Sequence, residues 1–209
     1  MIGLFGGTFD PIHFGHLRPA LDVMEALSLD VLRFIPAHRP PLRDEPVVTS
    51  RQRVDMVKLA ILRQPGFVLD TCELEREGPS YTVDTLQLLR EKSGKSIPLA
   101  LLLGSDAFAK LSQWHAWEKL TELAHIAVMM RPDAALDESD FPDGWLAERL
   151  TDSVGACRAK PSGKIITVAV TQLAISATDI RARLAAGQSI HYLTPEPVCD
   201  YIEEYGLYQ

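Results

Sequence analysis

The chain has 209 residues, of which 46% are hydrophobic and 23% are charged, which is an ordinary composition for a soluble globular protein. These values exclude intrinsic disorder, collagen-like repeats and coiled coils as its main organisation. Because 28 Asp and Glu outnumber 21 Lys and Arg, the formal charge is −7, and we expect neither a nucleic-acid partner nor a membrane partner. An anionic ligand would therefore need a local cluster of donors.

Cysteine usage and the apolar runs bear on location. The three cysteines, Cys72, Cys157 and Cys199, are odd in number and widely spaced, which suits neither a disulfide framework nor a metal site. The first ten residues lack a basic leader, and runs such as residues 99–103 fall far short of the roughly 20 residues that span a bilayer. We expect a cytoplasmic protein with reduced thiols, no export signal and no membrane anchor.

Strand-length apolar runs alternate with helical periodicity along the chain. Strands are predicted at residues 2–5, 31–35, 67–69, 99–103, 126–130 and 165–170, and helices at about 16–27, 51–62, 83–90, 117–123, 179–185 and 197–204. Several strands are apolar nearly throughout, which is typical of parallel strands covered on both faces. The order predicts an α/β fold with a doubly wound, mainly parallel sheet and helices on both faces.

Two stretches interrupt this alternation. The proline-rich loop 36–46 and the segment 132–164, which has one short helical pattern near Trp145, are interpreted as insertions in a single domain spanning residues 1–209. Helix-end signals support the boundaries. Ser50 and Thr178 are predicted N-caps, and Gly187 lies where a C-terminal glycine is expected.

The first candidate site is the turn after the opening strand, GGTFDPIHFGH at residues 6–16. Glycines let the backbone approach a ligand closely, and N–H groups at a helix start favour phosphate. His13 and His16 are three residues apart, so their rings can donate to one ligand even when neutral. From the pair alone, the interpretation as ordinary loop and cap histidines is favoured. The sequence shows no third ligand for zinc, no G-x-G-x-x-G fingerprint and no P-loop.

Two further segments also follow strands or open helices. In ISATDIR, residues 175–181, the hydroxyls of Ser176 and Thr178 and the helix N–H groups could form an anion cradle, and Arg181 adds a bidentate donor. The alternative is a capped helix with a surface arginine. Asp106, after Gly104, could accept hydrogen bonds from ribose hydroxyls at a strand end, or the segment could only cap a helix.

The fourth segment combines residues 80–83 (SYTV) with residues 114–117 (WHAW). Tryptophans three positions apart are usually half-buried core or edge residues. On pattern alone this structural interpretation is favoured.

The string GGTFDPIHFGH resembles the signature of the nucleotidylyltransferases, whose H-x-G-H motif binds ATP phosphates, and ISATDIR resembles their second motif. The resemblance implies a Rossmann-like α/β fold and no covalent intermediate on either histidine. It assigns catalytic roles to His13, His16 and Arg181. It assigns ATP binding to Gly6, Gly7, Thr8, Phe9, Gly15, Gly104, Asp106, Ser176 and Thr178.

Within that superfamily, the S-Y-T motif at residues 80–82 and the W-H pair at residues 114–115 resemble motifs of the bacterial nicotinate mononucleotide adenylyltransferases. The resemblance implies that Thr82, Val83, Trp114 and His115 bind nicotinate mononucleotide, with the tryptophan stacked on the pyridine ring and backbone amides holding its carboxylate. One departure is Leu42, where many relatives have a histidine, although Arg39 and Arg43 could compensate for its absence.

The implied reaction joins ATP and nicotinate mononucleotide into nicotinate adenine dinucleotide and pyrophosphate, with Mg²⁺ brought mainly by ATP and no metal ligand assigned to a side chain. Two alternatives stay open. One is a sister adenylyltransferase that uses nicotinamide mononucleotide or phosphopantetheine, and the other is a non-catalytic nucleotide-binding sensor. Whether the chain forms a homo-oligomer is also left open.

Overall fold

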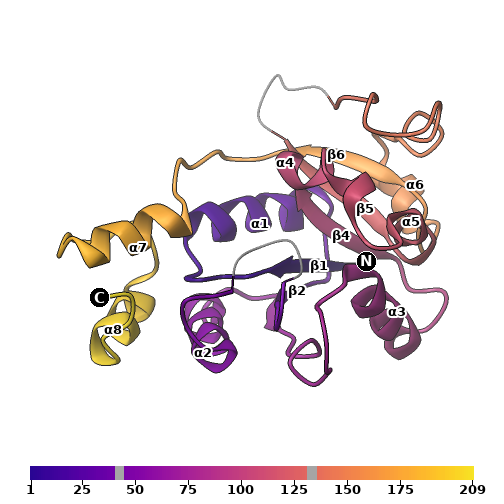
Figure 1. Ribbon diagram of the computed structural model, residues 1–209. Coiled ribbons are helices and arrows are strands. Elements are labelled where there is room, and N and C mark those ends of the chain that lie inside the picture. Colours follow the sequence, from indigo (N-terminus) through magenta and orange to yellow (C-terminus); the bar gives the residue numbers. More distant parts are fainter. Residues whose placement is uncertain (41–44, 131–135) are drawn as a thin grey trace. The chain divides into compact units, whose positions relative to one another are not determined.

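A computed structural model describes residues 1–40, 45–130 and 136–209 of the chain (Figure 1). Six strands form one sheet in the order β3-β2-β1-β4-β5-β6, in which the strand order reverses between β1 and β4. The strands are β1 (Ile2–Gly7), β2 (Val31–Pro36), β3 (Phe67–Leu69), β4 (Leu99–Gly104), β5 (His125–Met130) and β6 (Ile165–Ala169). All six lie at their predicted positions. The parallel α/β fold class is therefore confirmed.

The helices are α1 (Phe14–Ala26), α2 (Ser50–Ile61), α3 (Thr82–Ser93), α4 (Ser105–Phe108), α5 (Leu120–Leu123), α6 (Val154–Arg158), α7 (Ala177–Ala185) and α8 (Glu196–Glu204), with 3₁₀ turns at Leu111–Gln113 and Trp117–Lys119. The predicted helix at 117–123 is a 3₁₀ turn followed by α5. Helices α4 and α6 were not predicted, because four or five residues are too few to establish a periodic pattern.

Two predicted N-caps are wrong by one or two residues. Thr49, not Ser50, caps α2: its hydroxyl accepts the Gln52 N–H at 3.3 Å, while the Gln52 side chain accepts the Thr49 N–H at 3.0 Å. Ser176, not Thr178, caps α7 and accepts the Asp179 N–H at 3.1 Å. Both helices start before their apolar periodicity does.

The C-terminal signal of α7 is confirmed, and the helical pattern near Trp145 is not. Gly187 has φ 65° and donates to the Leu184 carbonyl at 2.9 Å, which closes the helix. Around Trp145 the backbone makes successive turns instead of a helix, in a stretch where Gly144 takes φ 74°, far from the helical value. Within segment 132–164, the part that the structure describes forms its helix at α6.

The chain divides into two compact units, each made of three stretches. Unit 1 comprises Met1–Phe5, Ala20–Leu32 and Tyr81–Thr171, and unit 2 comprises Gly6–Pro19, Arg33–Ser80 and Gln172–Gln209. The single domain with two insertions stays a prediction. Leu42 and Arg43 in the first insertion lie outside the described residues, as do 132–135 in the second.

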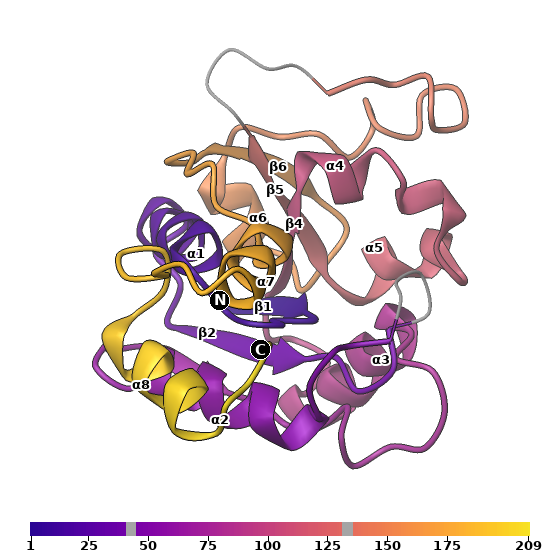
Figure 2. The same cartoon turned by 60° about the vertical axis from the view of Figure 1, so that its left-hand side comes forward.

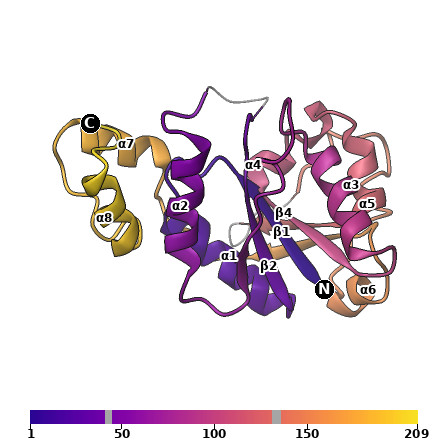
Figure 3. The ribbon, with the colours of Figure 1, turned by 90° about the horizontal axis from the view of Figure 1, so that it is seen from below.

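Unit 1 is built on buried parallel strands. β4 pairs with β1 and with β5, and β5 pairs with β6. Every residue of β5 is buried, as expected for a strand covered on both faces. Helices α3 and α5 pack together (Figure 3). The rings of Phe108, Trp117, Phe141 and Trp145 form an aromatic cluster, with Phe141 stacked on Trp145 at 4.9 Å.

Unit 2 places its helices around the turn that follows β1. Helix α2 packs against α8 (Figure 2). It also packs against β3. The Phe34 ring contacts the rings of Phe9 and Phe67, with centroids 6.0 and 4.8 Å away. No helix among the described residues of the chain is long and apolar enough to cross a membrane.

Candidate active site

The turn after β1 presents the two predicted histidines on one side of the first turn of α1. The His13 carbonyl accepts the N–H groups of His16 and Leu17 at 2.9 and 3.1 Å, so the helix starts immediately after His13. The imidazole rings stack with centroids 3.8 Å apart and planes inclined by 29°. The i, i+3 spacing has therefore brought the two rings together.

His13 is a neutral group in the folded protein. Its side chain is buried, and this desolvation lowers its pKa from 6.5 to about 4. Its Nδ1 has no hydrogen-bond partner among the described residues. A neutral imidazole still has one N–H donor, so His13 can offer a hydrogen bond to an anion without carrying charge.

Gly15 lets the second motif run beside this turn. A Cβ added at Gly15 would lie 2.9 Å from both His13 Nδ1 and the Ile175 carbonyl oxygen. That distance is shorter than real Cβ contacts, and a backbone carbonyl cannot move aside as a side-chain end can. Glycine is thus required here by the close approach of the residues that lead into α7.

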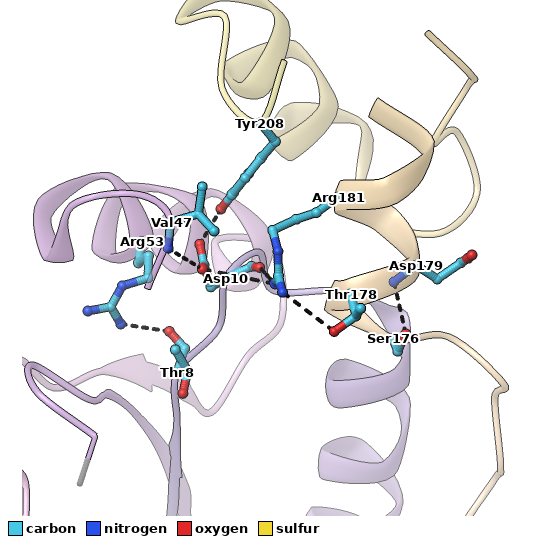
Figure 4. A network of polar contacts seen from close by, with 9 residues as sticks. All are labelled: Thr8, Asp10, Val47, Arg53, Ser176, Thr178, Asp179, Arg181 and Tyr208. Atoms are coloured by element: carbon cyan, nitrogen blue, oxygen red, sulfur yellow. Dashed lines mark hydrogen bonds and ion pairs between the residues drawn. The ribbon is translucent and has the colours of Figure 1, made fainter. Parts of the chain in front are cut away.

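Arg181 joins α7 to the same turn. Its Nη1 donates to the Asp10 backbone oxygen at 2.6 Å, and its Nη2 lies 3.4 Å from Thr178 Oγ1 (Figure 4). The Ser176 hydroxyl uses a lone pair to cap α7, which leaves its proton available for donation to a ligand. Unit 2 therefore brings together the two segments predicted to bind phosphate, residues 6–16 and 175–181, which lie near opposite ends of the sequence.

Asp10 was not predicted as a functional residue, but its buried carboxylate organises this assembly. One oxygen accepts the Tyr208 O–H at 2.7 Å and the other accepts the Val47 N–H at 2.8 Å (Figure 4). Burial and the bond to Asp10 strongly raise the pKa of Tyr208, so its phenol stays protonated and donates. The sequence signal that could have pointed to Asp10 is that it is the one charged residue in GTFDPI, residues 7–12.

Two more unpredicted residues form hydrogen bonds to backbone carbonyls of the turn after β1. Arg53 is fully buried and donates to the Thr8 carbonyl at 2.6 Å and to Ser50 Oγ at 3.0 Å. Burial lowers the Arg53 pKa, yet a guanidinium remains charged. Thr194 donates its hydroxyl to the Ile12 carbonyl at 2.7 Å. These contacts fix the backbone that presents His13.

The remaining predicted residues of the turn have mainly packing roles in the structure. Phe9 is buried with φ 50°, and its ring meets His16 edge-on at 5.2 Å. A Cβ at Gly7 would lie 2.7 Å from the Phe9 ring, whereas Gly6 has only the Ile35 carbonyl, at 4.0 Å. Phe9 thus supports the His16 ring, and Gly7 makes room for Phe9.

The predicted pyridine-binding residues all belong to unit 1. Thr82 and Val83 open α3, whose N-cap Tyr81 provides no side-chain cap, so the first N–H groups are not capped by that residue. The Trp114 ring has no ring contact among the described residues, whereas Trp117 belongs to the aromatic cluster. The ring of the exposed His115 contacts the Tyr81 ring, with centroids 4.4 Å apart and planes inclined by 35°.

Gly104 and Asp106 also belong to unit 1. Gly104 is the N-cap of α4 and Asp106 lies exposed in its first turn, with no side-chain cap hydrogen bond. A Cβ at Gly104 would meet nothing within 4 Å, so the space beside it is open. Neither the carboxylate of Asp106 nor the hydroxyl of Ser105 caps the helix, unlike the structural alternative considered for this segment.

In residues 1–40, 45–130 and 136–209, no three or more His, Cys, Asp or Glu side chains lie close enough together to hold a metal ion. The histidine pair has no third ligand in the described chain.

The lowered pKa of His13 predicts a pH dependence of stability. Unfolded His13 binds a proton near pH 6.5 but folded His13 only near pH 4, so the free energy of unfolding should fall as the pH drops between these values, by about 3 kcal/mol. Urea unfolding of the wild type and of His13→Asn at pH 7 and pH 4.5 measures how much of the pH-dependent loss of unfolding free energy comes from His13. The variant should lose less stability on acidification, and equal losses would contradict the neutral, buried His13.

Comparison with known proteins gives the same family throughout. A family model described as cytidylyltransferase-like matches residues 4–183. The "Probable nicotinate-nucleotide adenylyltransferase" of Dechloromonas aromatica (strain RCB) is 49% identical over 100% of this chain and 97% of that protein. Its namesake from Hydrogenovibrio crunogenus is 48% identical over 100% and 98%.

Solved structures agree on the fold. The nicotinic acid mononucleotide adenylyltransferase of Plasmodium falciparum, complexed with NaAD, has a TM-score of 0.74 at 20% identity over 99% of this chain and 96% of that one. The same enzyme complexed with APC has a TM-score of 0.73. Because this chain is 49% and 48% identical to these two relatives over its whole length, it belongs to the nicotinate-nucleotide adenylyltransferase family.

Proposed function

We propose that the chain transfers the adenylyl group of ATP to nicotinate mononucleotide, giving nicotinate adenine dinucleotide and pyrophosphate, a step of NAD synthesis. One observation carries the assignment of the phosphate site. The turn that bears His13 and His16 is hydrogen-bonded to Arg181 through Asp10, and Gly15 lies against Ile175. The imidazoles of the first family motif and the guanidinium of the second therefore lie at the same turn of unit 2, the turn after β1.

In the proposed reaction, a phosphate oxygen of nicotinate mononucleotide attacks the α-phosphorus of ATP in line. A new P–O bond forms, the bond to the bridging oxygen breaks, and negative charge develops on the leaving pyrophosphate. His13 and His16 donate hydrogen bonds to it, and Arg181 adds a charged fork. No general base is assigned, because a phosphate monoester is already ionised near neutral pH.

ATP would enter as its Mg²⁺ complex, with the ion held mainly by phosphate oxygens of the substrate. The proposed donors around the turn after β1 are imidazoles, hydroxyls and a guanidinium, which suit phosphate oxygens better than a hard cation. Cys72, Cys157 and Cys199 are buried and form no disulfide among the described residues, which is in keeping with the proposed cytoplasmic setting.

For the second substrate, α3 and Trp114 supply the proposed recognition. N–H groups at a helix start favour a carboxylate over an uncharged amide, whose NH₂ group would face donors. The half-buried Trp114 ring is available for stacking on a pyridinium. This combination supports nicotinate over nicotinamide as the preferred ring.

The acceptor is tested directly by measuring pyrophosphate release from ATP and Mg²⁺. Nicotinate mononucleotide, nicotinamide mononucleotide and phosphopantetheine are each supplied in turn. We expect fastest release with nicotinate mononucleotide. Faster release with either rival would assign the chain to a sister adenylyltransferase, and no release with any acceptor would favour the nucleotide-binding sensor.

The role of His16 is tested by His16→Ala. Loss of one preorganised donor should lower kcat by on the order of 10² to 10³. His191→Ala is the matched control, because His191 is exposed in the same unit and has no proposed role. Turnover within a few-fold of wild type in His16→Ala would remove His16 from the mechanism.

The role of Trp114 is tested by Trp114→Ala. Loss of stacking should weaken binding of nicotinate mononucleotide by about 1 to 3 kcal/mol and spare ATP. Titration calorimetry with each ligand measures both affinities, and Trp117→Phe, in the aromatic cluster, serves as the control. Equal weakening of both ligands by Trp114→Ala would show that Trp114 is a core residue.

A further inference from the structure

Near the end of the chain, Tyr208 contacts the site in a way that the proposed mechanism does not use. Its phenol O–H donates to Asp10 Oδ1 at 2.7 Å, and both side chains are buried. Tyr208 has φ 65° and follows Gly206 at φ 57°, so the backbone turns back to bring the ring to Asp10. The left-handed region is unfavourable for tyrosine and persists only where surrounding contacts hold it.

The Asp10 carboxylate lies beside Arg181 without forming a close ion pair with it. Arg181 Nη1 donates to the Asp10 backbone oxygen at 2.6 Å, whereas it lies 4.0 Å from Oδ2. Oδ2 already accepts the Val47 N–H, and Oδ1 accepts the Tyr208 O–H. The polar hydrogens that satisfy the carboxylate thus come from Val47 and Tyr208, not from the guanidinium.

Removing the phenol hydroxyl would change this balance. A buried carboxylate oxygen without a donor is unfavourable, and a guanidinium is its strongest available partner. Arg181 would then rotate to form a two-point contact with Asp10. The same N–H groups would no longer be available to a phosphate ligand.

We propose that Tyr208 is a positioning residue for catalysis: by satisfying the Asp10 carboxylate, it keeps the Arg181 guanidinium bonded to the Asp10 backbone oxygen and to Thr178 and not to the carboxylate, so that its remaining N–H groups can donate to the leaving pyrophosphate (Figure 4). The inference rests on the proposed function of Arg181 as a phosphate ligand. Tyr208 itself touches no substrate and acts only through Asp10 and Arg181.

The first test compares Tyr208→Phe with Tyr201→Phe. Tyr201 undergoes the same change in the same C-terminal segment, but its hydroxyl lies 3.4 Å from Asp55 and not near Asp10. We expect Tyr208→Phe to lower kcat about tenfold, the scale of one buried acceptor left without its donor, with the KM for nicotinate mononucleotide unchanged. Tyr201→Phe should behave as the wild type. Normal kcat in Tyr208→Phe overturns the proposal.

The second test is a pair of double-mutant cycles. The loss caused by Tyr208→Phe should vanish when Asp10→Asn removes the charge that attracts Arg181, and also when Arg181→Ala removes the guanidinium. An equal loss in either background would mean that Tyr208 acts by another route. Thermal unfolding accompanies the kinetics, and a Tyr208→Phe protein that is unfolded at the assay temperature also overturns the proposal, since Tyr208 would then be a stability residue.

These outcomes are distinguishable from failure of the proposed function. If Arg181→Ala turns over normally, the role of Arg181 as a phosphate ligand is wrong, and Tyr208 has nothing to position. If Arg181→Ala is impaired and Tyr208→Phe is not, only the inference about Tyr208 fails.

Discussion

A single hydrogen bond, from Arg181 Nη1 to the backbone oxygen of Asp10, joins two parts of the chain that lie 171 residues apart. The proposed phosphate site depends on it. The turn after β1 supplies imidazoles and α7 supplies a guanidinium and hydroxyls, and neither set alone surrounds a polyphosphate. Loop closure over such a distance is entropically costly, so several contacts must hold the two parts together. Further hydrogen bonds between these parts are donated by the Thr194 hydroxyl to the Ile12 carbonyl, by the Tyr208 phenol to Asp10 and by the Phe14 N–H to the Leu193 carbonyl.

The site shows how an acidic protein can offer donors to a polyanion. With a formal charge of −7, the chain as a whole repels ATP, so attraction must be local. His13 contributes a hydrogen bond without charge, because its pKa is lowered to about 4. Arg53 is also charged, but its guanidinium donates to the Thr8 carbonyl and so holds the backbone of the turn after β1. Arg181 is left as the cation with a proposed role toward the phosphates.

The sequence predicted the elements that depend on local patterns. The six strands were predicted from their apolar runs, which suit buried strands such as β5, although no residue of the short β3 is buried. The two motifs were noticed from their residue types and spacing, but a phosphate role was assigned to them by resemblance to a family. The N-caps of α2 and α7, Thr49 and Ser176, were placed one and two residues too late, because a cap precedes the apolar periodicity of its helix. The pattern near Trp145 gave turns instead of a helix in a stretch where Gly144 takes a positive φ.

The network behind the site could not be predicted, for a different reason. Asp10, Arg53 and Tyr208 are polar residues whose burial follows from tertiary packing, and their sequence neighbours give no sign of their partners. Tyr208 in particular looks like an ordinary residue near a chain end, where side chains are usually exposed. The residues of unit 1 that are predicted to bind the second substrate, such as Trp114 and Thr82, were singled out by resemblance more than by pattern.

The central claim is that both motifs hold the same triphosphate, and a crystal structure of the protein with Mg²⁺ and a non-hydrolysable ATP analogue tests it most directly. We expect the β- and γ-phosphates to lie within hydrogen-bond distance of His13, His16 and Arg181 together. Phosphates that contact only one of the two motifs, or that lie away from the turn after β1, would contradict it.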